Sequence, residues 1–444
     1  MGLVTDLYEL TMSSSYLRRG MTAPATFSLF ARRLPPDRGF LVAAGLDDVL
    51  STLEDFAFDD TDLEWLAGND FDPDTLDALA QLRFTGDVWG MAEGRVFFAN
   101  EPLIEVTAPL PEAQLVETLV LNQLTYQSAL ATKAARCRVA ADGRAELVDF
   151  SLRRTHGIEA GMSAARAAAI AGFAGTSNVE AARRLGIPAV GTMAHSYVEA
   201  FSDERGAFMA YAEDFPNRTT FLVDTYDTFT GIKTAIEVAD ELDLQSGLGI
   251  RLDSGDLLDL SKQARRLLDD AGRHDVAIVA SGGCDEFIVR QLLDAGAPID
   301  IFGVGTSVGT SADAPTLDTA YKLVEYEGRP VMKLSTGKET RPGPKQVYRS
   351  DLSAPDLLAT RSEPAPDGHT PLLAEVMRAG RRTAPAEPLT AARERLHDDL
   401  ALLPAALSEL RSPSPPTVRV SDRLESLTIE VSQQHSATTP PPAG

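Results

Sequence analysis

Six short apolar runs between residues 145 and 304 constrain the fold most, because polar residues or glycines follow every one of them. The runs span residues 145–150, 189–193, 221–223, 249–252, 276–280 and 299–303. Asp224, Asp253, Ser281 and Gly305 follow the last four runs at intervals of 29, 28 and 24 residues, which suits one strand, one helix and two short loops. The pattern predicts an α/β fold of repeated strand–helix units around a parallel sheet.

The position of the polar groups favours one type of parallel sheet. In a (β/α) barrel of the TIM type, the carboxyl ends of all strands converge on one mouth, so groups far apart in sequence meet in space. An open doubly wound sheet would gather ligands only near its switch point. Because six strand ends carry polar groups or glycines, we expect an irregular barrel, with the open sheet as the alternative.

The segments on either side of the barrel predict a second, smaller α/β domain. We expect strands at 26–31 and 87–98, the latter with a Glu93-Gly94 turn, helices at 47–56 and 111–135, and a hairpin at 322–334 turned at Glu327-Gly328. The predicted organisation is an N-terminal α/β domain at 1–140, the barrel with the catalytic site at 141–320, and a segment at 321–432 that completes the smaller domain. Residues 433–444 lack apolar side chains to offset ordering, so we expect a disordered tail.

Charge and composition exclude several classes of function. The chain has 65 acidic and 41 basic residues, a net charge of −24, which leaves no broad basic surface for nucleic acid or for a membrane. No apolar stretch approaches the roughly 20 residues of a membrane span, and no secretory pattern opens the sequence, so we expect a cytoplasmic protein. Its two cysteines, Cys137 and Cys284, exclude a disulfide scaffold.

The strongest local motif is GIRLDSGD at 249–256, where a strand should become a helix. Its carboxylates at Asp253 and Asp256, with Arg251, Ser254 and Gly255, could hold the hydroxyls of a ribose, a magnesium ion or both. The alternative is a tight turn in which Asp256 only caps the next helix, although that leaves Asp253 and Arg251 without a role.

Two later strand ends are rich in glycine. Backbone N–H groups exposed there, at the start of the following helix, favour a phosphate, although simple turns would also use glycine. The second stretch starts like a dinucleotide fingerprint, but Val308 stands where the third glycine should be. The candidate phosphate-binding residues are Gly282, Gly283, Gly303, Gly305 and Thr306.

Three further strand ends offer candidates, each with a structural alternative. His195, in TMAHS, is either catalytic or a structural histidine. Phe150 with Arg153 or Arg154 suits a flat anionic ring, or is a core phenylalanine beside surface arginines. The stretch 175–180, which includes Thr176, predicts a capping box in which Ser177 caps the helix and Glu180 is the glutamate three residues later. The N-terminus of that helix could also bind an anion. Together these groups point to phosphoribosyl transfer.

The motifs resemble those of the nicotinate phosphoribosyltransferases of NAD salvage. The matching stretches run in order through nearly the whole chain: TDLYELTM, DFSLRRTHG, AGFAGTSNVEAARRLGIPAVGTMAHS, LVDTYDT, GIRLDSGD, ASGG, FGVGTS, YKLVEY and PGPKQVYR. The resemblance implies an irregular type II phosphoribosyltransferase barrel with a smaller α/β domain. It also implies an enzyme that joins nicotinate to phosphoribosyl pyrophosphate (PRPP), forms nicotinate mononucleotide and pyrophosphate, and couples this to ATP hydrolysis.

The resemblance also implies roles for individual residues. His195 would be the histidine that ATP phosphorylates, and Tyr8 would reach across a homodimer to stack on the pyridine ring. Magnesium would be the cofactor, with Asp253 and Asp256 as its candidate ligands. The residues implied to lie near nicotinate are Phe150, Arg153 or Arg154, Thr176 and Ser177. The residues implied to lie near PRPP are Arg251, Asp253, Ser254, Gly255, Asp256, Gly282, Gly283, Gly303, Gly305 and Thr306. Lys322 and Lys345 are weaker candidates for contacts with phosphate.

Three neighbouring functions remain as alternatives. Nicotinamide phosphoribosyltransferases have an aspartate where this chain has Ser177, and a carboxylate there would repel nicotinate. Quinolinate phosphoribosyltransferases are shorter chains with a more basic pocket. A catalytically inert, ligand-binding descendant would be expected to lose His195 or the carboxylates of the DSGD stretch, and all of these are present.

Overall fold

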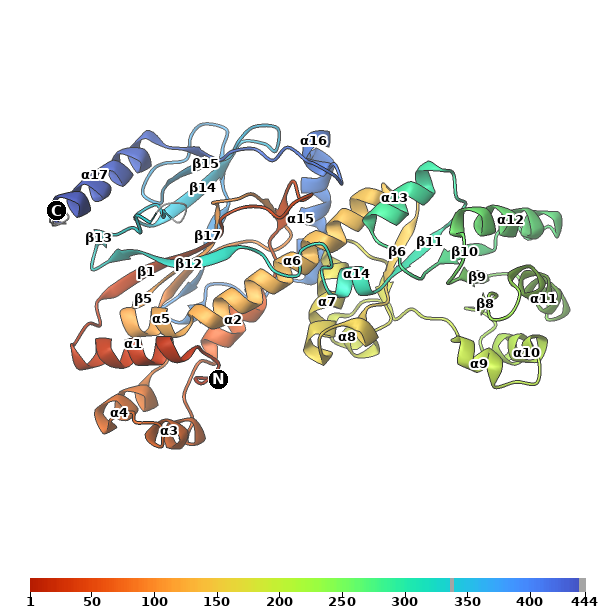
Figure 1. The fold of residues 1–444 in the computed structure, drawn as a ribbon, viewed down its shortest axis with the longest axis horizontal. Helices are drawn as coiled ribbons and strands as arrows, with labels where there is room; N and C mark the ends of the chain where they lie inside the picture. The colour runs from red at the N-terminus through yellow and green to blue at the C-terminus, as the bar shows by residue number, and fades with distance from the viewer. Residues whose placement is uncertain (336–338, 439–444) are drawn as a thin grey trace, which may run out of the picture. The chain divides into compact units, whose positions relative to one another are not determined.

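The computed structural model describes residues 1–335 and 339–438, which form two compact units (Figure 1). One unit comprises Met1–Ala129 and Thr316–Gly444, and the other comprises Leu130–Pro315. The division falls inside the long helix α6 (Glu117–Ala141), rather than at its end. The unit from Leu130 to Pro315 contains all the predicted site residues except Tyr8 and the two weaker phosphate candidates, Lys322 and Lys345.

A parallel six-stranded sheet is the centre of the unit Leu130–Pro315. The strand order is β7-β6-β11-β10-β9-β8, and each strand pair is parallel. The strands are β6 (Glu146–Asp149), β7 (Gly175–Thr176), β8 (Thr220–Leu222), β9 (Gly249–Leu252), β10 (Ala277–Ala280) and β11 (Ile301–Val304). Five of these lie within one or two residues of the predicted runs.

The strand order confirms part of the barrel prediction and corrects the rest. The first strand, β6, pairs with the last, β11, as in a barrel. In the described part of the chain, however, no pairing joins β8 to the stretch 189–193, which makes only the single bridge between Thr176 and Ala189. Pro188 has no backbone N–H and Gly191 has no side chain to pack, which disfavours a strand there. The sheet is therefore a curled half-barrel rather than a closed TIM barrel.

Helices follow the strands of this unit as the sequence pattern predicts. In α12, Leu257, Ala264 and Leu268 are buried at helical spacing, and the helix contacts β9 and β10. Figure 1 shows α11, α12 and α13 along one side of this sheet. The helices are η1 (Leu152–Arg154), α7 (Ile158–Ile170), α8 (Val179–Leu185), α9 (His195–Glu199), α10 (Glu204–Asp214), α11 (Thr228–Glu241), α12 (Leu257–Asp270), α13 (Glu286–Asp294) and α14 (Thr306–Gly309).

The other unit is built on a seven-stranded antiparallel sheet in which three strands from the N-terminal segment form the centre and strands from the C-terminal segment flank them on both sides. The order is β13-β12-β1-β5-β3-β17-β18. Its strands are β1 (Pro24–Ala31), β3 (Asp87–Met91), β5 (Pro102–Pro109), β12 (Thr319–Tyr326), β13 (Arg329–Pro330), β17 (Leu373–Arg378) and β18 (Arg381–Arg382). The predicted hairpin is present as β12 and β13, with Glu327 and Gly328 at positive φ in its turn.

Helices and two small sheets complete this unit. The first sheet has the order β16-β14-β15-β19 and consists of β14 (Lys345–Arg349), β15 (Leu357–Thr360), β16 (Thr370–Pro371) and β19 (Arg419–Val420). The second sheet is the pair β2 (Leu41–Val42) and β4 (Val96–Phe97). The helices are α1 (Leu7–Arg18), α2 (Leu46–Glu54), α3 (Asp60–Ala67), α4 (Pro73–Gln81), α5 (Leu110–Leu115), α15 (Leu389–Leu402), α16 (Ala405–Ser408) and α17 (Asp422–Thr438).

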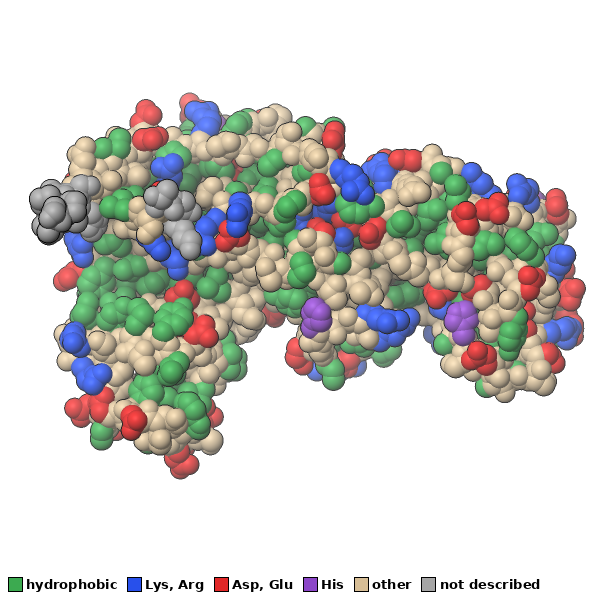
Figure 2. Space-filling view, viewed as in Figure 1, with side chains coloured by type: hydrophobic (Ala, Val, Ile, Leu, Met, Phe, Trp, Pro, Cys, Tyr) green, Lys and Arg blue, Asp and Glu red, His purple; other side chains and the backbone are tan. Residues whose placement is uncertain are grey.

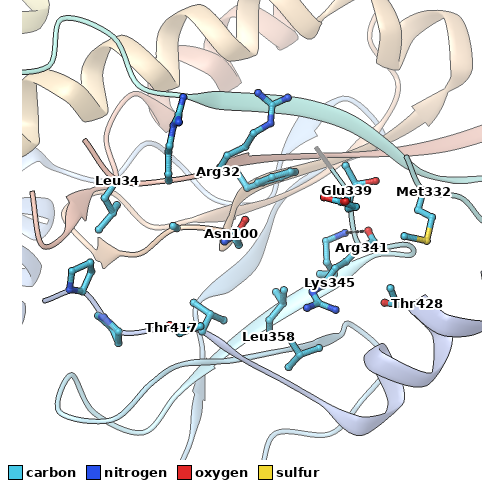
Figure 3. Close-up of a pocket in the computed structure, with 18 of the residues that line it drawn as sticks. Arg32, Leu34, Asn100, Met332, Glu339, Arg341, Lys345, Leu358, Thr417 and Thr428 are labelled. Atoms are coloured by element: carbon cyan, nitrogen blue, oxygen red, sulfur yellow. Dashed lines mark hydrogen bonds between the residues drawn. The ribbon is translucent and has the colours of Figure 1, made fainter. Parts of the chain in front are cut away.

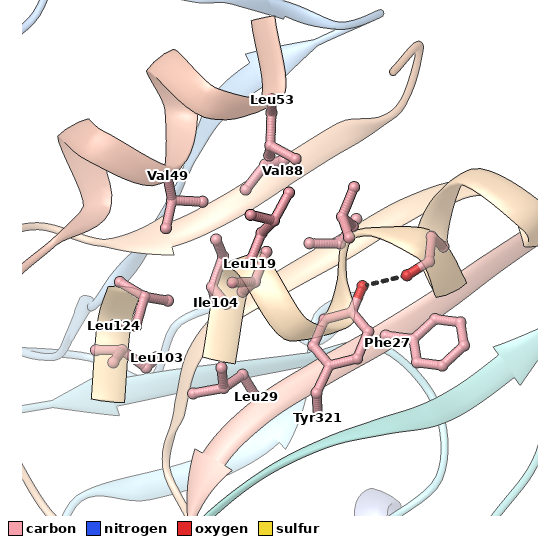
Figure 4. Packing of buried hydrophobic residues seen from close by; sticks show 14 of the residues in the cluster. Phe27, Leu29, Val49, Leu53, Val88, Leu103, Ile104, Leu119, Leu124 and Tyr321 are labelled. Atoms are coloured by element: carbon pink, nitrogen blue, oxygen red, sulfur yellow. Dashed lines mark hydrogen bonds between the residues drawn. The ribbon is translucent and has the colours of Figure 1, made fainter. Parts of the chain in front are cut away.

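The core of this unit lies between the large sheet and its helices (Figure 4). Phe27 of β1 stacks on Tyr321 of β12, with ring centroids 4.8 Å apart. The buried Tyr321 hydroxyl donates a hydrogen bond to the carbonyl oxygen of Ala113 in α5, at 2.9 Å. This bond satisfies a phenol that burial would otherwise leave unpaired.

Three expectations for this unit were wrong. Residues 87–98 do not form one strand pair, because β3 lies in the large sheet while β4 pairs with β2. The helix expected at 111–135 is broken at Val116 into α5 and α6. Part of the expected disordered tail, 433–438, continues α17, since adding turns to an established helix is favourable, and 439–444 lie outside the described residues.

On the face drawn in Figure 2, acidic and basic side chains are interspersed. Among the described residues, none of the helices combines the length and the apolar character that crossing a membrane requires.

Candidate active site

Three neighbouring strand ends are tied together around Asp253. Asp224, which follows β8, accepts hydrogen bonds at Oδ2 from the Asp253 backbone N–H and from the Ser254 hydroxyl, both at 2.8 Å. Ser281, which follows β10, donates a hydrogen bond from its hydroxyl to Asp253 Oδ1. The carboxyl ends of β8, β9 and β10 therefore present one connected group of polar side chains.

His195 lies beside this group, at the start of α9. Its Nδ1 is 3.1 Å from the Thr225 hydroxyl, and its Nε2 is 4.0 Å from Asp253 Oδ2. The side chain is 41% exposed. Because Thr225 occupies Nδ1, Nε2 is the ring nitrogen that faces the carboxylate and remains open to a ligand.

Arg251 extends from β9 into the same site. Its Nη1 donates a hydrogen bond to the Thr192 hydroxyl, and its Nε is 3.9 Å from Asp253 Oδ1. Burial lowers the pKa of Arg251, while the negative charges of Asp253 and Asp224 oppose that shift. The charge of Arg153 also lowers the pKa of Arg251, which places Arg153 within electrostatic reach of this site.

Two buried polar atoms of the site have no hydrogen-bond partner among the described residues: Asp224 Oδ1 and Arg251 Nε. Leaving a buried donor or acceptor unpaired costs about 1–3 kcal/mol, so native structures rarely do so without a reason. One atom accepts and the other donates, and both belong to side chains that contact Asp253 or its backbone. A bound polar ligand with an acceptor and a donor would satisfy both atoms, whereas a cation would satisfy only Asp224 Oδ1.

Asp256 does not share this arrangement. Its Oδ1 accepts hydrogen bonds from the backbone N–H groups of Leu258 and Asp259, at 3.1 and 3.2 Å, so it caps α12. Within the described ranges, no three His, Cys, Asp or Glu side chains are grouped closely enough to hold a metal ion by themselves. The structural alternative raised for Asp256 is therefore present, whereas Asp253 faces the site.

The predicted phosphate-binding glycines differ in their backbone constraints. Gly282 has φ +85°, and a Cβ there would lie 2.0 Å from the Asp253 carbonyl oxygen. Gly283 has φ +72° with open space around it. A Cβ at Gly303 would lie 2.5 Å from the Phe150 ring, so the ring packs directly against that glycine. Gly305 precedes α14, which begins at Thr306.

The β7 end holds Thr176 and Ser177 in different environments. Thr176 is fully buried, and its hydroxyl donates to Asp149 at 2.6 Å and accepts from the Asn178 N–H at 3.0 Å. Ser177 is partly exposed, and its N–H donates to the Asp149 carbonyl oxygen at 2.8 Å. Thr176 therefore supports the loop, while Ser177 is accessible.

The capping box predicted for α8 was assigned to the wrong residue. Asn178 is the cap, because its Oδ1 accepts from the Ala181 N–H at 3.1 Å. Glu180 instead pairs with Arg183 and Arg184, at 2.7 and 2.6 Å. An asparagine one position later caps equally well, and two basic residues on the same face attract the glutamate.

Comparison with known proteins identifies the family. Residues 3–125 match the family model of the nicotinate phosphoribosyltransferase (NAPRTase) N-terminal domain, and residues 145–349 match that of the nicotinate phosphoribosyltransferase (NAPRTase) family. The chain belongs to the nicotinate phosphoribosyltransferase family. It is thus an enzyme of the class that its motifs resemble.

Relatives of the family span most of the chain. Nicotinate phosphoribosyltransferase pncB2 of Mycobacterium tuberculosis is 48% identical over 430 residues, which cover 95% of this chain and 92% of that protein. The nicotinate phosphoribosyltransferase of Bacillus subtilis is 46% identical, covering 79% of this chain and 73% of the relative. The crystal structure of human nicotinic acid phosphoribosyltransferase matches with a TM-score of 0.87 at 30% identity, covering 97% of this chain and all 100% of that chain.

Tyr8 and the two candidate lysines lie in the other unit, which comprises Met1–Ala129 and Thr316–Gly444. Tyr8, in the first turn of α1, is 46% exposed, and burial together with the charges of Glu117 and Glu9 raises the pKa of its phenol. Lys345 is buried with its Nζ 3.2 Å from Glu105 Oε1, and the Lys322 Nζ is 3.7 Å from Glu117 Oε1. Both lysines are therefore already paired with carboxylates.

A large cavity of about 1030 Å³ lies in that same unit and is separate from the strand-end site (Figure 3). Leu34, Met332 and Leu358 supply apolar lining, and Lys345 and Arg341 face one another, with the Lys345 Nζ donating to the Arg341 carbonyl oxygen at 3.4 Å. Arg32 and Arg33, which also line it, both pair with Asp318.

Sequence reasoning missed five residues that the structure brings into the strand-end site. Asp224 was recognised only as a strand-end marker, and Thr225 follows it in the LVDTYDT stretch, so the stretch itself was the available signal. Nothing in the local sequence distinguishes the others, because their roles depend on hydrogen bonds to strands far away in the chain. The five are Asp149, Thr192, Asp224, Thr225 and Ser281.

Proposed function

We propose that this enzyme joins nicotinate to PRPP and releases nicotinate mononucleotide and pyrophosphate, as a step of NAD salvage. The observation that carries the proposal is the strand-end site, where His195 and Arg251 lie about Asp253 and where Arg251 Nε and Asp224 Oδ1 are buried without hydrogen-bond partners in the described part of the chain. The names of the relatives in Mycobacterium tuberculosis and Bacillus subtilis support the same reaction.

The substrate has two ends, and the site offers a distinct set of groups to each. Phe150 and Arg153 provide an aromatic surface and a cation for the ring and carboxylate of nicotinate, beside the accessible Ser177. Arg154, the next residue of η1, is the alternative cation for this role. The backbone at Gly283, Gly305 and Thr306 suits the 5′-phosphate of PRPP, because N–H groups at a helix start favour anions.

The chemistry requires stabilisation of charge rather than a base. Breaking the bond between C1′ and the pyrophosphate oxygen leaves positive charge on the ribose and negative charge on the pyrophosphate. Arg251 would stabilise the leaving group, and Asp253 would hold the ribose hydroxyls. The pyridine nitrogen of nicotinate attacks C1′ directly, and since it carries no proton, no general base is needed.

Magnesium fits the oxygen donors of this site. Asp224 Oδ1 is buried without a partner in the described part of the chain, and Asp253 offers a second carboxylate. Mg²⁺ prefers one or two carboxylates together with waters and phosphate oxygens. A bound Mg²⁺ would neutralise charge on the pyrophosphate of PRPP. Asp256, which caps α12, is a weaker ligand candidate than Asp224.

We further propose that ATP phosphorylates His195 at Nε2. In this step Nε2 attacks the γ-phosphorus, the bond to the β,γ-bridging oxygen breaks, and ADP leaves with that electron pair. Water later hydrolyses the phosphohistidine to inorganic phosphate. Thr225 supports this assignment because it occupies Nδ1 at 3.1 Å and leaves Nε2 facing the site. A phosphoryl group there would change the charge that the pyrophosphate meets.

We propose that two chains complete each site. Tyr8 is exposed although aromatic, and it lies outside the unit that carries the strand-end site. A homodimer in which Tyr8 of one subunit stacks on the pyridine bound by the other would give this exposed ring a function.

The test is pyrophosphate release from PRPP and Mg²⁺ with nicotinate or nicotinamide, each with and without ATP. We expect release with nicotinate, enhanced by ATP, and loss of that enhancement in His195→Ala. His156→Ala is the matched control, because His156 is exposed and outside the site, and it should retain the enhancement. Release with nicotinamide alone would reassign the substrate, and silence with both would contradict the proposed reaction.

A further inference from the structure

Asp149 occupies the junction between the two halves of the strand-end site. It is the last residue of β6, fully buried, and lies between two neighbouring strands. In the sheet register it is paired with Thr176 of β7 on one side and with Val304 of β11 on the other. The loop after β7 carries Ser177, and the residue after Asp149 is Phe150.

The Asp149 side chain binds the backbone and side chains of both adjoining loops. Its Oδ1 accepts a hydrogen bond from the Ser151 N–H at 2.9 Å, and its Oδ2 accepts one from the Thr176 hydroxyl at 2.6 Å. Thr176 in turn accepts from the Asn178 N–H at 3.0 Å. One carboxylate therefore sets the path of the chain around Phe150 and around Ser177.

This carboxylate is costly to bury. Burial raises the pKa of Asp149, while the hydrogen bonds from Ser151 and Thr176 oppose that shift. No cation forms an ion pair with it among the residues the structure describes, so hydrogen bonds alone compensate for the lost hydration. A strand end needs no carboxylate for packing, and the sheet hydrogen bonds form without it. What the carboxylate adds is a defined orientation of the two loops.

We infer that Asp149, acting through Thr176, is a positioning residue that holds the Phe150 and Ser177 loops in the geometry that binds nicotinate. The inference rests on the proposed function and adds a determinant of affinity for the pyridine substrate. Asp149 itself contacts loops, not the reacting atoms.

The side-chain hydrogen bonds of Asp149 lead directly to the loops that carry Phe150 and Ser177. The groups proposed for PRPP are held by other residues: Thr192 binds Arg251, Asp224 binds the Asp253 backbone, and Thr225 binds His195. None of these three hydrogen bonds involves Asp149 or Thr176. The phosphate candidate Gly303 packs against the Phe150 ring, but the backbone pairing of β11 with β6 positions that strand without the Asp149 side chain. Loosening the Asp149 side-chain bonds should therefore weaken nicotinate binding far more than PRPP binding.

The test compares Michaelis constants for both substrates in Asp149→Asn, Thr176→Val and Thr176→Ser. Asp149→Asn keeps the size of the side chain but turns one acceptor into a donor, and Thr176→Val removes the hydroxyl. We expect each to raise the KM for nicotinate about tenfold or more and to change the KM for PRPP by less than about twofold, as loss of a buried charged hydrogen bond predicts. Thr176→Ser restores the hydroxyl and should restore the KM.

The double variant Asp149→Asn/Thr176→Val provides the sharpest control. Because both changes remove the same hydrogen bond, their effects on the KM for nicotinate should be far less than multiplicative. Melting temperatures of all variants check the fold. If Asp149→Asn does not fold, the difference in the KM for nicotinate between Thr176→Val and Thr176→Ser tests the positioning role.

Each outcome has a distinct meaning. An unchanged KM for nicotinate, or an equal rise for both substrates, would overturn the positioning role while leaving the reaction intact. A wild-type enzyme that releases no pyrophosphate with nicotinate would overturn the proposed function, and with it this inference.

Discussion

Individual buried atoms in this protein separate structural from ligand-binding roles. Asp256 and Asp253 belong to the same DSGD stretch, yet Asp256 bonds the backbone of α12 while Asp253 faces His195 and Arg251. Asp224 Oδ1 stays unpartnered in the described ranges although it is buried. A structural aspartate differs from a candidate ligand-binding one in whether its carboxylate oxygens are already occupied by hydrogen bonds within the protein.

Ser177 is predicted to determine the choice between nicotinate and nicotinamide. We expect Ser177→Asp to raise the KM for nicotinate about tenfold or more, since a like charge near the substrate carboxylate costs at least about 1–2 kcal/mol. The KM for PRPP should change little. Steady-state kinetics with both pyridines check this, with the nearly isosteric Ser177→Asn as the uncharged control. Unchanged nicotinate kinetics in Ser177→Asp would contradict the prediction.

Glu9, a buried residue of α1, should make stability depend on pH. Burial raises its pKa from about 4.5 to about 7, although hydrogen bonds from Thr118 and Thr5 oppose the shift. The folded state therefore holds its proton more tightly than the unfolded state does. Stability from this group is fully present below pH 4.5 and falls by about 3 kcal/mol as the pH rises towards about 7.

Urea unfolding of Glu9→Gln at pH 5 and pH 8 checks the sign. Relative to the wild type, the variant should become more stable at the higher pH, because glutamine cannot ionise. Glu64→Gln, an exposed position on α3, serves as the control and should follow the wild type at both pH values. A difference between wild type and Glu9→Gln that is independent of pH would refute the assignment.

At the scale of elements, turns and helix starts carry most of the site. The loops that follow β8, β9 and β10 are joined by Asp224, Asp253 and Ser281, so their side chains are held before any substrate binds. Preorganisation of this kind reduces the cost of arranging charges during the reaction. The strands fix the distances between the loops, and the short loops carry the polar side chains of the site.

Two adjacent glycines in the loop after β10 should respond differently to the same change. A Cβ at Gly282 would lie 2.0 Å from the Asp253 carbonyl oxygen, whereas Gly283 has open space. We expect Gly283→Ala to cost about 1–2 kcal/mol of stability from its positive φ alone. Gly282→Ala should cost more and displace Asp253, which would reduce affinity for PRPP.

Thermal unfolding and PRPP binding by calorimetry distinguish the two variants. Each serves as the other's control, since both residues have positive φ and differ only in the space around Cβ. Equal losses of stability and of PRPP affinity in Gly282→Ala and Gly283→Ala would show that the close contact with Asp253 has no consequence.

At the scale of the whole molecule, the proposed dimer makes a quantitative prediction. His195 and Tyr8 lie in different units, and we propose that each active site takes one from each subunit. Tyr8→Ala and His195→Ala should each show almost no ATP-enhanced pyrophosphate release alone, and that enhancement is the activity compared here. After subunit exchange, half of the dimers are mixed and each has one intact site, so activity should recover to about a quarter of the wild-type value.

The matched control mixes His195→Ala with Asp253→Asn. Both residues belong to the unit Leu130–Pro315, so every site in the mixed dimer keeps one defect and no activity should return. Recovery in this control, or none in the mixture with Tyr8→Ala, would contradict a site shared in the proposed way. Pyrophosphate release measures both.

Local patterns in the chain were sufficient to predict the strands around 146–149, 249–252 and 277–280, the helix α12 and the placement of polar side chains at the strand ends. Strand length, helical periodicity and the glycines of turns depend on neighbours in sequence, which is why those features could be inferred from one chain. The family resemblance extended this to roles for His195 and Tyr8, which stay predictions.

Contacts between distant strands decided the rest. Whether the parallel sheet closes depends on hydrogen bonds between β8 and the stretch 189–193, which do not form in the described chain. Asp149 is hydrogen-bonded to Thr176, 27 residues away in the chain, and Asp224 is hydrogen-bonded to Asp253, 29 residues away. The roles of both aspartates depend on these distant partners. Such bonds follow from the register of paired strands and from competition among nearby donors, so only the folded structure specifies them.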